Sequence, residues 1–321
     1  MANKDDQIME ALFLKGTFRE KIWGGEKLAT EFGYEIPSNK TGEYWAISGH
    51  RNGPSTVING PYAGKTIDEL WKQHRELFGN EPGEVFPLLT KILDAQADLS
   101  VQVHPDDAYG LKHEGDLGKT ECWYILSAED DAEIVYGHHA ETKEELEEKI
   151  AAGEWEELLH SEKVKAGDFF YLPSGTIHAI GSGIMILETQ QSSDTTYRLY
   201  DYDRRDDDGN LRDLHIEKSI DVTTVPHKDY EGLAEKTVAE DSVIEKLVAS
   251  EFFSVYKWIV DGLVDFKAEG PYTLVSVIQG DGKLILGEDN YSIKKGDHFI
   301  LPHGITEWQL DGQMELIASH T

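Results

Sequence analysis

Four side chains that can bind a metal ion stand in three apolar segments with the pattern of β-strands. Gln102 and His104 are two residues apart in the first segment, so a strand would place the amide and the imidazole on one face of a sheet. Glu121 lies in the second segment, and His178 follows a Pro-x-Gly turn at the end of the third. Polar groups that face inward are costly unless something satisfies them, and a metal ion does so. We therefore predict a metal site with nitrogen and oxygen ligands.

Two lysines near these segments have both a functional and an ordinary interpretation. Lys119 is two residues before Glu121, so on a strand it shares a face with that carboxylate and points toward the same cavity. Lys91 lies in the middle of the apolar run 86–94. Its charge must either meet an anion in a site or reach solvent from an edge strand, and the residues alone leave both interpretations open.

Arg198 belongs to the predicted strand 195–201. Alternation along a strand places Thr196, Arg198 and Tyr200 on one face. If that face lines the cavity, the guanidinium can approach substrate oxygens near the metal without being a ligand.

Other residues of types that could take part in catalysis or metal binding also have ordinary explanations. His50 ends a predicted strand, where it either lines the rim of the cavity or lies exposed in a turn. The pair His138 and His139 precedes an acidic helix, and we expect it to be exposed to solvent rather than to form a second metal site. Cys122 alternates away from Glu121, which predicts a small buried apolar residue.

Composition restricts the partners and the compartment. The chain has 321 residues, of which 61 are acidic and 30 basic, and its net charge is −31. Such a charge repels nucleic acid and anionic membranes, so we expect neither as a partner, and an anionic substrate would need locally placed lysine or arginine. One cysteine rules out an internal disulfide and a cysteine-rich zinc site. With no secretory signal and no apolar run that spans a bilayer, the sequence predicts a cytoplasmic protein.

An internal repeat predicts a duplicated β-fold. Residues 164–178 align without gaps to residues 293–307, and glycine, aspartate, phenylalanine, leucine and proline recur at a constant offset. Many short strands with glycine and proline turns are typical of an antiparallel sandwich or jelly roll. In the second copy Glu307 replaces His178, and no Gln-x-His strand precedes it. We therefore expect two barrels, of which one keeps the site.

Two capping boxes, Thr66 to Glu69 and Thr142 to Glu145, predict helices in this otherwise β-rich chain. The first helix is expected to be amphipathic, with one face that continues as far as Leu77.

The order of these elements suggests three parts. We expect a catalytic domain over residues 1–213 with a helical insertion at about 140–160, a charged and partly helical connector over 214–250, and a degenerate second domain over 251–321. The acidic run 201–208 is predicted to be a solvated turn. The sequence favours neither a monomer nor a homo-oligomer.

The Gly-Asp-x-x-x-x-Pro-x-Gly pattern followed by histidine resembles the cupin barrel. Together, several motifs resemble the type I mannose-6-phosphate isomerases in their short bacterial form. The resemblance extends from the start of the chain to Asp201, is weak in the C-terminal third, and rests on residues 23–25, 42–50, 86–94, 99–107, 119–121 and 193–201.

The resemblance implies a role for each matching residue. One zinc ion per chain would be held by Gln102, His104, Glu121 and His178. Lys91 and Lys119 would face the substrate, and Arg198 would be the catalytic arginine. Glu188 matches an inward carboxylate ten residues before that arginine, although its spacing from His178 is one residue longer than in the longer members.

The implied activity is a zinc-dependent aldose–ketose isomerisation between mannose 6-phosphate and fructose 6-phosphate through an enediolate, with a lysine, preferably Lys91, taking the phosphate. One alternative is an iron-dependent cupin oxygenase, which Gln102 in place of a histidine disfavours. The other is a non-catalytic sugar-binding protein. Loss of the Lys119–Glu121 pair or of Arg198 would have supported it, and neither is lost.

Overall fold

The computed structural model describes residues 9–230, 232 and 235–321. Strands predominate, as the sequence predicts. The chain divides into two compact units, and each unit is built from segments that are not contiguous in the sequence. Among the described residues, the first unit consists of 9–17, 45–88, 232 and 235–321, and the second of 18–44 and 89–230. The domain boundaries predicted at residues 213 and 251 follow the order of elements along the chain rather than compactness in space, and they stay a prediction.

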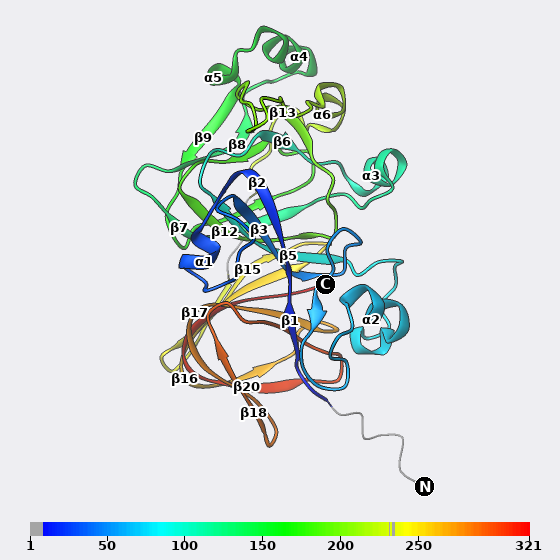
Figure 1. Cartoon of the computed structure of the whole chain (residues 1–321), viewed down its shortest axis with the longest axis vertical. Helices are drawn as coiled ribbons and strands as arrows, with labels where there is room; N and C mark the ends of the chain where they lie inside the picture. The colour runs from blue at the N-terminus through cyan, green and yellow to red at the C-terminus, as the bar shows by residue number, and fades with distance from the viewer. Residues whose placement is uncertain (1–8, 231, 233–234) are drawn as a thin grey trace. The chain divides into compact units, whose positions relative to one another are not determined.

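Most residues of two antiparallel sheets and most of the helices belong to the second unit (Figure 1). The six-stranded sheet has the order β10-β7-β12-β5-β3-β2, with β10 Phe169–Leu172, β7 Glu121–Ala128, β12 Ile184–Gln191, β5 Leu88–Ala95, β3 Thr41–Ser48 and β2 Thr17–Gly25. The five-stranded sheet has the order β13-β6-β11-β8-β9, with β13 Tyr197–Tyr200, β6 Val101–Val103, β11 His178–Ile180, β8 Glu133–His138 and β9 Leu159–Lys163. The helices are α1 Lys27–Thr30, α3 Asp107–Glu114, α4 Lys143–Ala152, α5 Trp155–Leu158 and α6 Ile216–Val222.

The five-stranded sheet is buried on both faces. One core cluster combines side chains from both sheets, among them Trp123 of β7 and Ile134 of β8. A second cluster packs Leu146 and Ile150 of α4 on the other face of the five-stranded sheet, against Val101 of β6. The helical insertion expected at 140–160 is therefore present, and it covers the outer face of the sheet that carries several predicted site residues.

The first unit is built on one long antiparallel sheet with the order β14-β15-β16-β20-β17-β19-β1-β4, and β18 pairs with β17. Its helices are α2 Ile67–Gln73 and the 3₁₀-helix η1 Arg75–Phe78. Its strands are β14 Glu235–Ala239, β15 Ser242–Ala249, β16 Ser254–Lys267, β20 Glu307–His320, β17 Thr273–Leu286, β19 His298–Leu301, β1 Leu12–Lys15, β4 Thr56–Val57 and β18 Asp289–Lys294.

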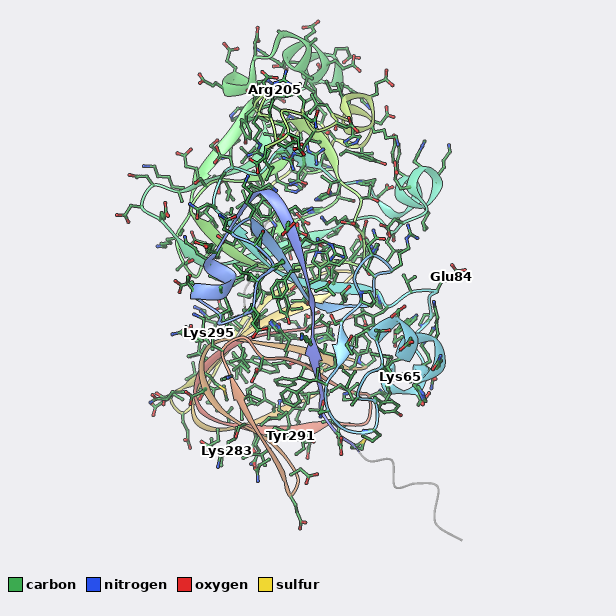
Figure 2. The ribbon with its side chains drawn as sticks, in the orientation of Figure 1. Lys65, Glu84, Arg205, Lys283, Tyr291 and Lys295 are labelled. Carbon is green, nitrogen blue, oxygen red and sulfur yellow. The ribbon has the colours of Figure 1, made fainter. Side chains whose placement is uncertain are left out.

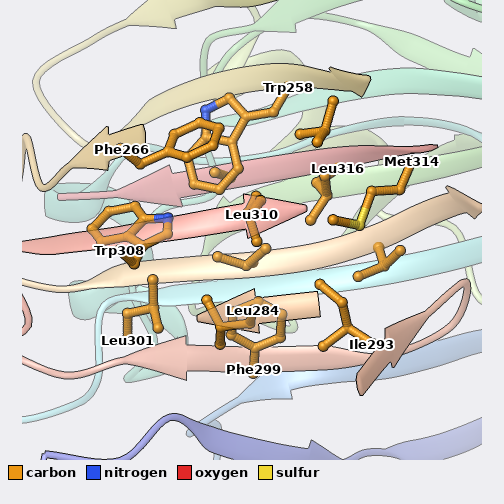
Figure 3. Packing of buried hydrophobic residues seen from close by; sticks show 14 of the residues in the cluster. Trp258, Phe266, Leu284, Ile293, Phe299, Leu301, Trp308, Leu310, Met314 and Leu316 are labelled. Carbon is orange, nitrogen blue, oxygen red and sulfur yellow. The ribbon is translucent and has the colours of Figure 1, made fainter. Parts of the chain in front are cut away.

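Apolar side chains from β16, β17, β19 and β20 form the core of this sheet (Figure 3). Charged side chains such as Lys65, Glu84 and Lys283 are exposed (Figure 2). This inside–outside division is what the alternation of apolar and charged residues predicts.

The repeat found in the sequence is also a repeat of backbone geometry. In each copy the aspartate accepts a hydrogen bond from the backbone N–H three residues earlier, from Lys165 to Asp168 and from Lys294 to Asp297, both at 2.9 Å. The glycine before each aspartate has a left-handed backbone, with φ of 93° and 95°. Only glycine adopts this region without strain. The duplicated fold is therefore confirmed at the turn that enters β10 and β19.

Two expectations about local structure need correction. Residues 214–250 do contain a helix, α6, but residues 235–249 form the hairpin of β14 and β15 rather than a connector. Cross-strand charges such as Lys236 and Glu245, 3.7 Å apart, give this hairpin a polar composition that hides its alternation. Helix α2 is capped by its box as predicted, but it ends at Gln73, before Leu77.

No helix within the described ranges is long and apolar enough to cross a membrane.

Gly118 fixes the loop that leads into Lys119 and Glu121, and we predict that Gly118→Ala lowers the activity of the predicted site. Its N–H donates to the carboxylate of Asp107 (2.9 Å). A Cβ at Gly118 would lie 2.4 Å from backbone atoms of Asp106 and Asp107. The loop must therefore shift, which costs about 1–3 kcal/mol of stability and displaces the two site residues.

Gly33→Ala is the matched control. Gly33 has a positive φ of 74° and nothing within 4 Å of the added Cβ, so the strain costs about 1–2 kcal/mol without moving the site. Thermal unfolding and steady-state kinetics of both variants separate the two effects. Equal activity in the two variants would contradict the positioning role of Gly118.

Candidate active site

A cavity of about 310 Å³ opens in the second unit. Its wall includes eight of the nine predicted site residues, namely Lys91, Gln102, His104, Lys119, Glu121, His178, Glu188 and Arg198. The sequence patterns therefore selected residues that the fold brings together.

Three of these residues form a buried cluster that can hold a metal ion. One ligand atom each from His104, Glu121 and His178 lie within 4.8 Å of one another. Nε2 of His104 is 3.6 Å from one carboxylate oxygen of Glu121, and Nε2 of His178 is 3.1 Å from the other. All three side chains are almost completely buried.

The backbone orients both imidazoles toward the carboxylate. Nδ1 of His104 lies 3.0 Å from the carbonyl oxygen of Thr195, and Nδ1 of His178 lies 2.8 Å from that of Thr176. A carbonyl requires a donor, so each Nδ1 carries the proton and each Nε2 offers its lone pair to the cluster. Oε2 of Glu121 is buried and has no hydrogen-bond partner. An orphaned carboxylate oxygen beside two such nitrogens fits a cation.

Strand pairing places Gln102 beside this cluster. In the five-stranded sheet, Gln102 is opposite His178 on one side and Arg198 on the other. The backbone N–H of Gly175 donates to the carbonyl oxygen of His104 (2.8 Å), which ties the turn before His178 to the end of β6. The predicted Gln-x-His strand and the lone histidine are thus held together by the sheet itself.

The protonation states also suit a cation. Burial alone would raise the pKa of Glu121, but Lys119 and the two imidazoles outweigh it and hold that pKa well below its ordinary value. Burial, with the nearby charge of Lys119, lowers the pKa of His104 to about 3. Burial lowers the pKa of Lys119, but Glu121 and Glu188 reverse this and raise it above its ordinary value. A carboxylate beside a neutral imidazole is the ligand state that metal binding requires.

Glu188 is the second buried carboxyl of the cavity. It lies on β12 opposite Trp123 on β7, and it accepts a hydrogen bond from the indole Nε1 of that residue (2.9 Å). Burial and the charge of Glu121 raise its pKa to about 7, against the opposing charge of Lys119. A carboxyl group with a pKa near neutrality can both accept and return a proton.

Lys91 is buried, and its side chain is 2 % exposed. Its ammonium lies 3.5 Å from Glu43, and β5 pairs on both sides within its sheet. The edge-strand interpretation is therefore wrong. The lysine points into the cavity and meets an anion there.

Arg198 and Thr196 line the cavity as predicted, but Tyr200 does not. The register shifts between Arg198 and Tyr200 where β13 pairs with β6. Such an irregularity changes the alternation of side chains, and Tyr200 stacks on Trp155 instead, with ring centroids 4.5 Å apart. The guanidinium of Arg198 is anchored by donation to the carbonyl oxygen of Asp213 (2.8 Å).

The remaining candidates differ in outcome. His50 is buried and accepts a hydrogen bond from the backbone N–H of Asn52 (3.1 Å). An exposed turn position is therefore wrong. His50 is the one predicted site residue that does not line the cavity, and a contact with substrate from the rim stays a prediction. His138 is also buried, with a ring nitrogen 2.8 Å from the carbonyl oxygen of Thr224, whereas His139 is exposed as expected. Cys122 is buried as predicted, and burial raises the pKa of its thiol.

Several cavity residues were missed by the sequence patterns. Trp123 shares the face of Glu121 by simple alternation and could have been found in that way. Glu43 and Arg212 have no such signal, because their positions depend on contacts with distant residues. Arg212 is held by a paired contact with Asp201 at 2.6 and 2.8 Å, so the acidic run is not solvated at its first residue.

Comparisons with known proteins identify the family of this chain. Residues 12–136 match the family model "Phosphomannose isomerase type I, catalytic domain", and residues 243–321 match "Mannose-6-phosphate isomerase, cupin domain". The mannose-6-phosphate isomerase of Streptococcus mutans is 60% identical over 316 residues, which cover 98% of this chain and 99% of that protein. The mannose-6-phosphate isomerase ManA of Bacillus subtilis is 57% identical over 312 residues, with 97% and 99% coverage.

Solved structures show the same similarity. The crystal structure of mannose 6-phosphate isomerase from Bacillus subtilis superposes with a TM-score of 0.95 at 50% identity, and the match covers 97% of this chain and 99% of that chain. A phosphomannose isomerase from Salmonella typhimurium superposes with a TM-score of 0.79 at 15% identity, with 97% and 99% coverage. The second likeness concerns the fold alone.

The raised pKa of Glu188 predicts a pH-dependent penalty on folding. The pKa rises from an ordinary 4.5 to about 7 on folding, so ionisation destabilises the folded state progressively between these values. Glu188→Gln removes the penalty. In chelator-treated protein, the variant should gain stability over the natural chain as the pH rises from 4.5 to 8, by on the order of 3 kcal/mol.

Denaturant unfolding of both proteins across this pH range measures the difference. Stability curves that stay parallel from pH 4.5 to 8 would contradict a raised pKa at this position.

Proposed function

The chain belongs to the type I mannose-6-phosphate isomerase family, and from that premise we propose a zinc-dependent isomerisation of mannose 6-phosphate to fructose 6-phosphate through an enediolate. The observation that carries the proposal is the buried cluster of His104, Glu121 and His178. The same cavity is lined by the carboxyl group of Glu188, which can carry a proton, and by several cationic side chains, namely Lys91, Lys119 and Arg198. High identity to named isomerases over nearly the whole chain argues against the oxygenase and the non-catalytic alternatives.

Zinc is the metal that the donor set suits best. Two imidazoles and one carboxylate without a thiolate are typical of catalytic zinc sites that leave a position open. We assign Gln102 as the fourth protein group of the site, since it lies beside His178 in the sheet and lines the same cavity. One zinc ion held there would supply Lewis-acid polarisation of the substrate's carbonyl and hydroxyl oxygens.

The protein's own groups carry the proton. The reaction moves one proton from C2 to C1 of the sugar and one from O2 to O1. Glu188 is the group we assign to the carbon-bound proton, because it is buried, has a pKa near neutrality and faces the cavity. Trp123 holds its carboxylate in place by donating a hydrogen bond. Lys119 keeps its charge between Glu121 and Glu188, where it can donate to a sugar oxygen.

Cations at the cavity explain how a strongly acidic protein accepts an anionic substrate. We assign the phosphate to Lys91 and the developing charge of the enediolate to Arg198, since both line the cavity. A guanidinium held by the Asp213 carbonyl is already oriented before the charge forms. The single cysteine among 321 residues supports a reducing compartment, and we propose the cytoplasm.

The metal assignment predicts that His104→Ala and His178→Ala each lose bound metal and activity together. The reason is that two of the three cluster ligands supply imidazole nitrogen. Elemental analysis gives the metal content, and a coupled assay for fructose 6-phosphate, run with and without chelator, gives the activity. Chelator should lower the melting temperature of the natural chain and leave that of the variants unchanged.

His139→Ala is the matched control, because His139 is exposed, and it should keep both metal and activity. Full metal occupancy in either cluster variant would refute the ligand assignment.

Arg198→Ala should lower kcat by on the order of 10²–10³, with metal content and KM within a few-fold of the natural values. The loss appears in kcat because the guanidinium acts mainly on charge that develops in the transition state. Arg198→Lys should recover only part of the rate, since a point charge cannot reproduce the planar fork. Steady-state kinetics with mannose 6-phosphate measures both parameters.

Arg205→Ala, at an exposed position, controls for the loss of one positive charge and should leave both parameters unchanged. A normal kcat with a large rise in KM for Arg198→Ala would make Arg198 a binding residue instead.

A further inference from the structure

A second cavity, of about 140 Å³, lies within the first unit, in the barrel that the sequence describes as degenerate. Its aromatic wall is formed by Trp258 and Phe266 of β16 and Trp308 of β20 (Figure 3). The rings of Trp258 and Phe266 are 4.5 Å apart, and those of Phe266 and Trp308 are parallel within 1°. An engineered apolar cavity of about 150 Å³ holds benzene, so this one has room for a six-membered ring.

The cavity occupies the position that corresponds to the metal site of the other barrel. The repeat aligns Leu172 with Leu301. Strand pairing places Leu172 opposite Glu121 and Leu301 opposite Thr273. Thr273 is therefore the counterpart of the metal-site carboxylate, and each of the two lines the cavity of its own barrel. The second barrel therefore also has a cavity at this place, with Thr273 where the other barrel has Glu121.

One donor in this wall is unsatisfied. Trp308 is only 4 % exposed, and its indole Nε1 has no hydrogen-bond partner among the described residues. A buried N–H without an acceptor is costly. An occupant that presents an acceptor oxygen to Trp308 would remove that cost.

The other polar groups restrict the charge of the occupant. The hydroxyl of Tyr256 donates to Glu269 (2.6 Å) and lies 3.0 Å from Nε2 of His320. Burial lowers the pKa of His320, so this imidazole is neutral at pH 7. The exposed residues Asp265, Glu269 and Lys267 also line the cavity and bring two carboxylates and one ammonium to its rim, a negative balance that disfavours an anion. The unsatisfied indole donor disfavours a cation.

The number of polar groups at the cavity further restricts the chemical class of its occupant. Besides Trp308, five side chains that line the cavity carry hydrogen-bonding groups without a permanent positive charge, namely Tyr256, Asp265, Glu269, Thr273 and His320. These groups are already satisfied in part: Tyr256, Glu269 and His320 are hydrogen-bonded to one another, and Asp265 accepts a hydrogen bond from Gln309 (2.7 Å). Their remaining acceptor positions can bind several hydroxyls of one ring. A ring with an apolar face and several hydroxyls matches both the aromatic wall and these groups.

We propose that this cavity binds a neutral monosaccharide in its pyranose form. The apolar C–H face of the sugar packs on the aromatic wall, one hydroxyl accepts from Nε1 of Trp308, and another donates to Glu269. The site is separate in sequence from the catalytic cavity, and its carboxylates select against the phosphorylated substrate.

The test follows the indole N–H signals of the full-length, metal-loaded protein labelled with ¹⁵N at its seven tryptophans. Trp308→Phe identifies the Trp308 signal by its disappearance. Titration with methyl α-D-mannopyranoside, a pyranose that cannot open, should shift this signal with millimolar saturation and leave the Trp123 signal of the catalytic barrel unmoved. Trp308→Phe should weaken binding about fivefold to tenfold, measured by saturation-transfer NMR of the sugar.

Trp71→Phe is the matched control. Trp71 is a buried tryptophan of the same unit whose Nε1 donates to the Gly83 carbonyl (3.3 Å), away from the cavity. It loses a similar volume and should keep sugar binding. If Trp308→Phe fails to fold, Glu269→Gln serves in its place and should also weaken binding several-fold.

Three results would overturn the proposal. The first is no movement of the Trp308 signal up to 100 mM of the neutral sugar. The second is a shift by phenol but by no sugar, which would make the site one for aromatic alcohols. The third is an equal or larger shift with mannose 6-phosphate, which would remove the charge selection.

Discussion

A carboxylate buried beside an ammonium is the constraint on which the catalytic unit depends. Glu121 has a side-chain exposure of 1 %, and Lys119, 3.7 Å away, has one of 7 %. Removing one partner of such a pair leaves an uncompensated buried charge, which costs about 3–5 kcal/mol. The imidazoles of His104 and His178 complete the surroundings of the carboxylate. Each member of the cluster therefore keeps its neighbours in the protonation state that a cation site needs.

Strand pairing sets the relative positions of three residues that line the catalytic cavity. Gln102, His178 and Arg198 are neighbours across three adjacent strands of one sheet. Helix α4 and its neighbours bury the outer face of that sheet, so these strands are packed on both sides. Side chains on doubly packed strands are held more precisely than side chains on exposed loops, which is what a site for a metal and an oriented substrate requires.

How much of this was visible in the sequence depends on the range of the interactions. Alternation over two residues placed Gln102 with His104 and Lys119 with Glu121, and the repeat predicted two related barrels. The face of Tyr200 was wrong because a register shift in β13 is decided by pairing with β6, which no local pattern contains. The hairpin at 235–249 was missed because its charges are matched across strands rather than along the chain. Glu43 and Arg212 could not be found, since only the fold brings Lys91 to one and Asp201 to the other.

The two barrels show that the turn, rather than the site, is what the repeat preserves. The aspartate-capped turn is the same in both copies within 0.1 Å in its hydrogen bond, yet the carboxylate at position 121 has become Thr273 and the histidine at 178 has become Glu307. A polar barrel interior without a cation would leave its charged groups unpaired. The interior of the second barrel is apolar instead, with Trp258, Phe266 and Trp308 in its core cluster. Trp308 brings an N–H that has no partner among the described residues. The second barrel therefore joins an apolar wall to one unpaired donor, whereas the cavity of the other barrel gathers carboxylates, imidazoles and cationic side chains.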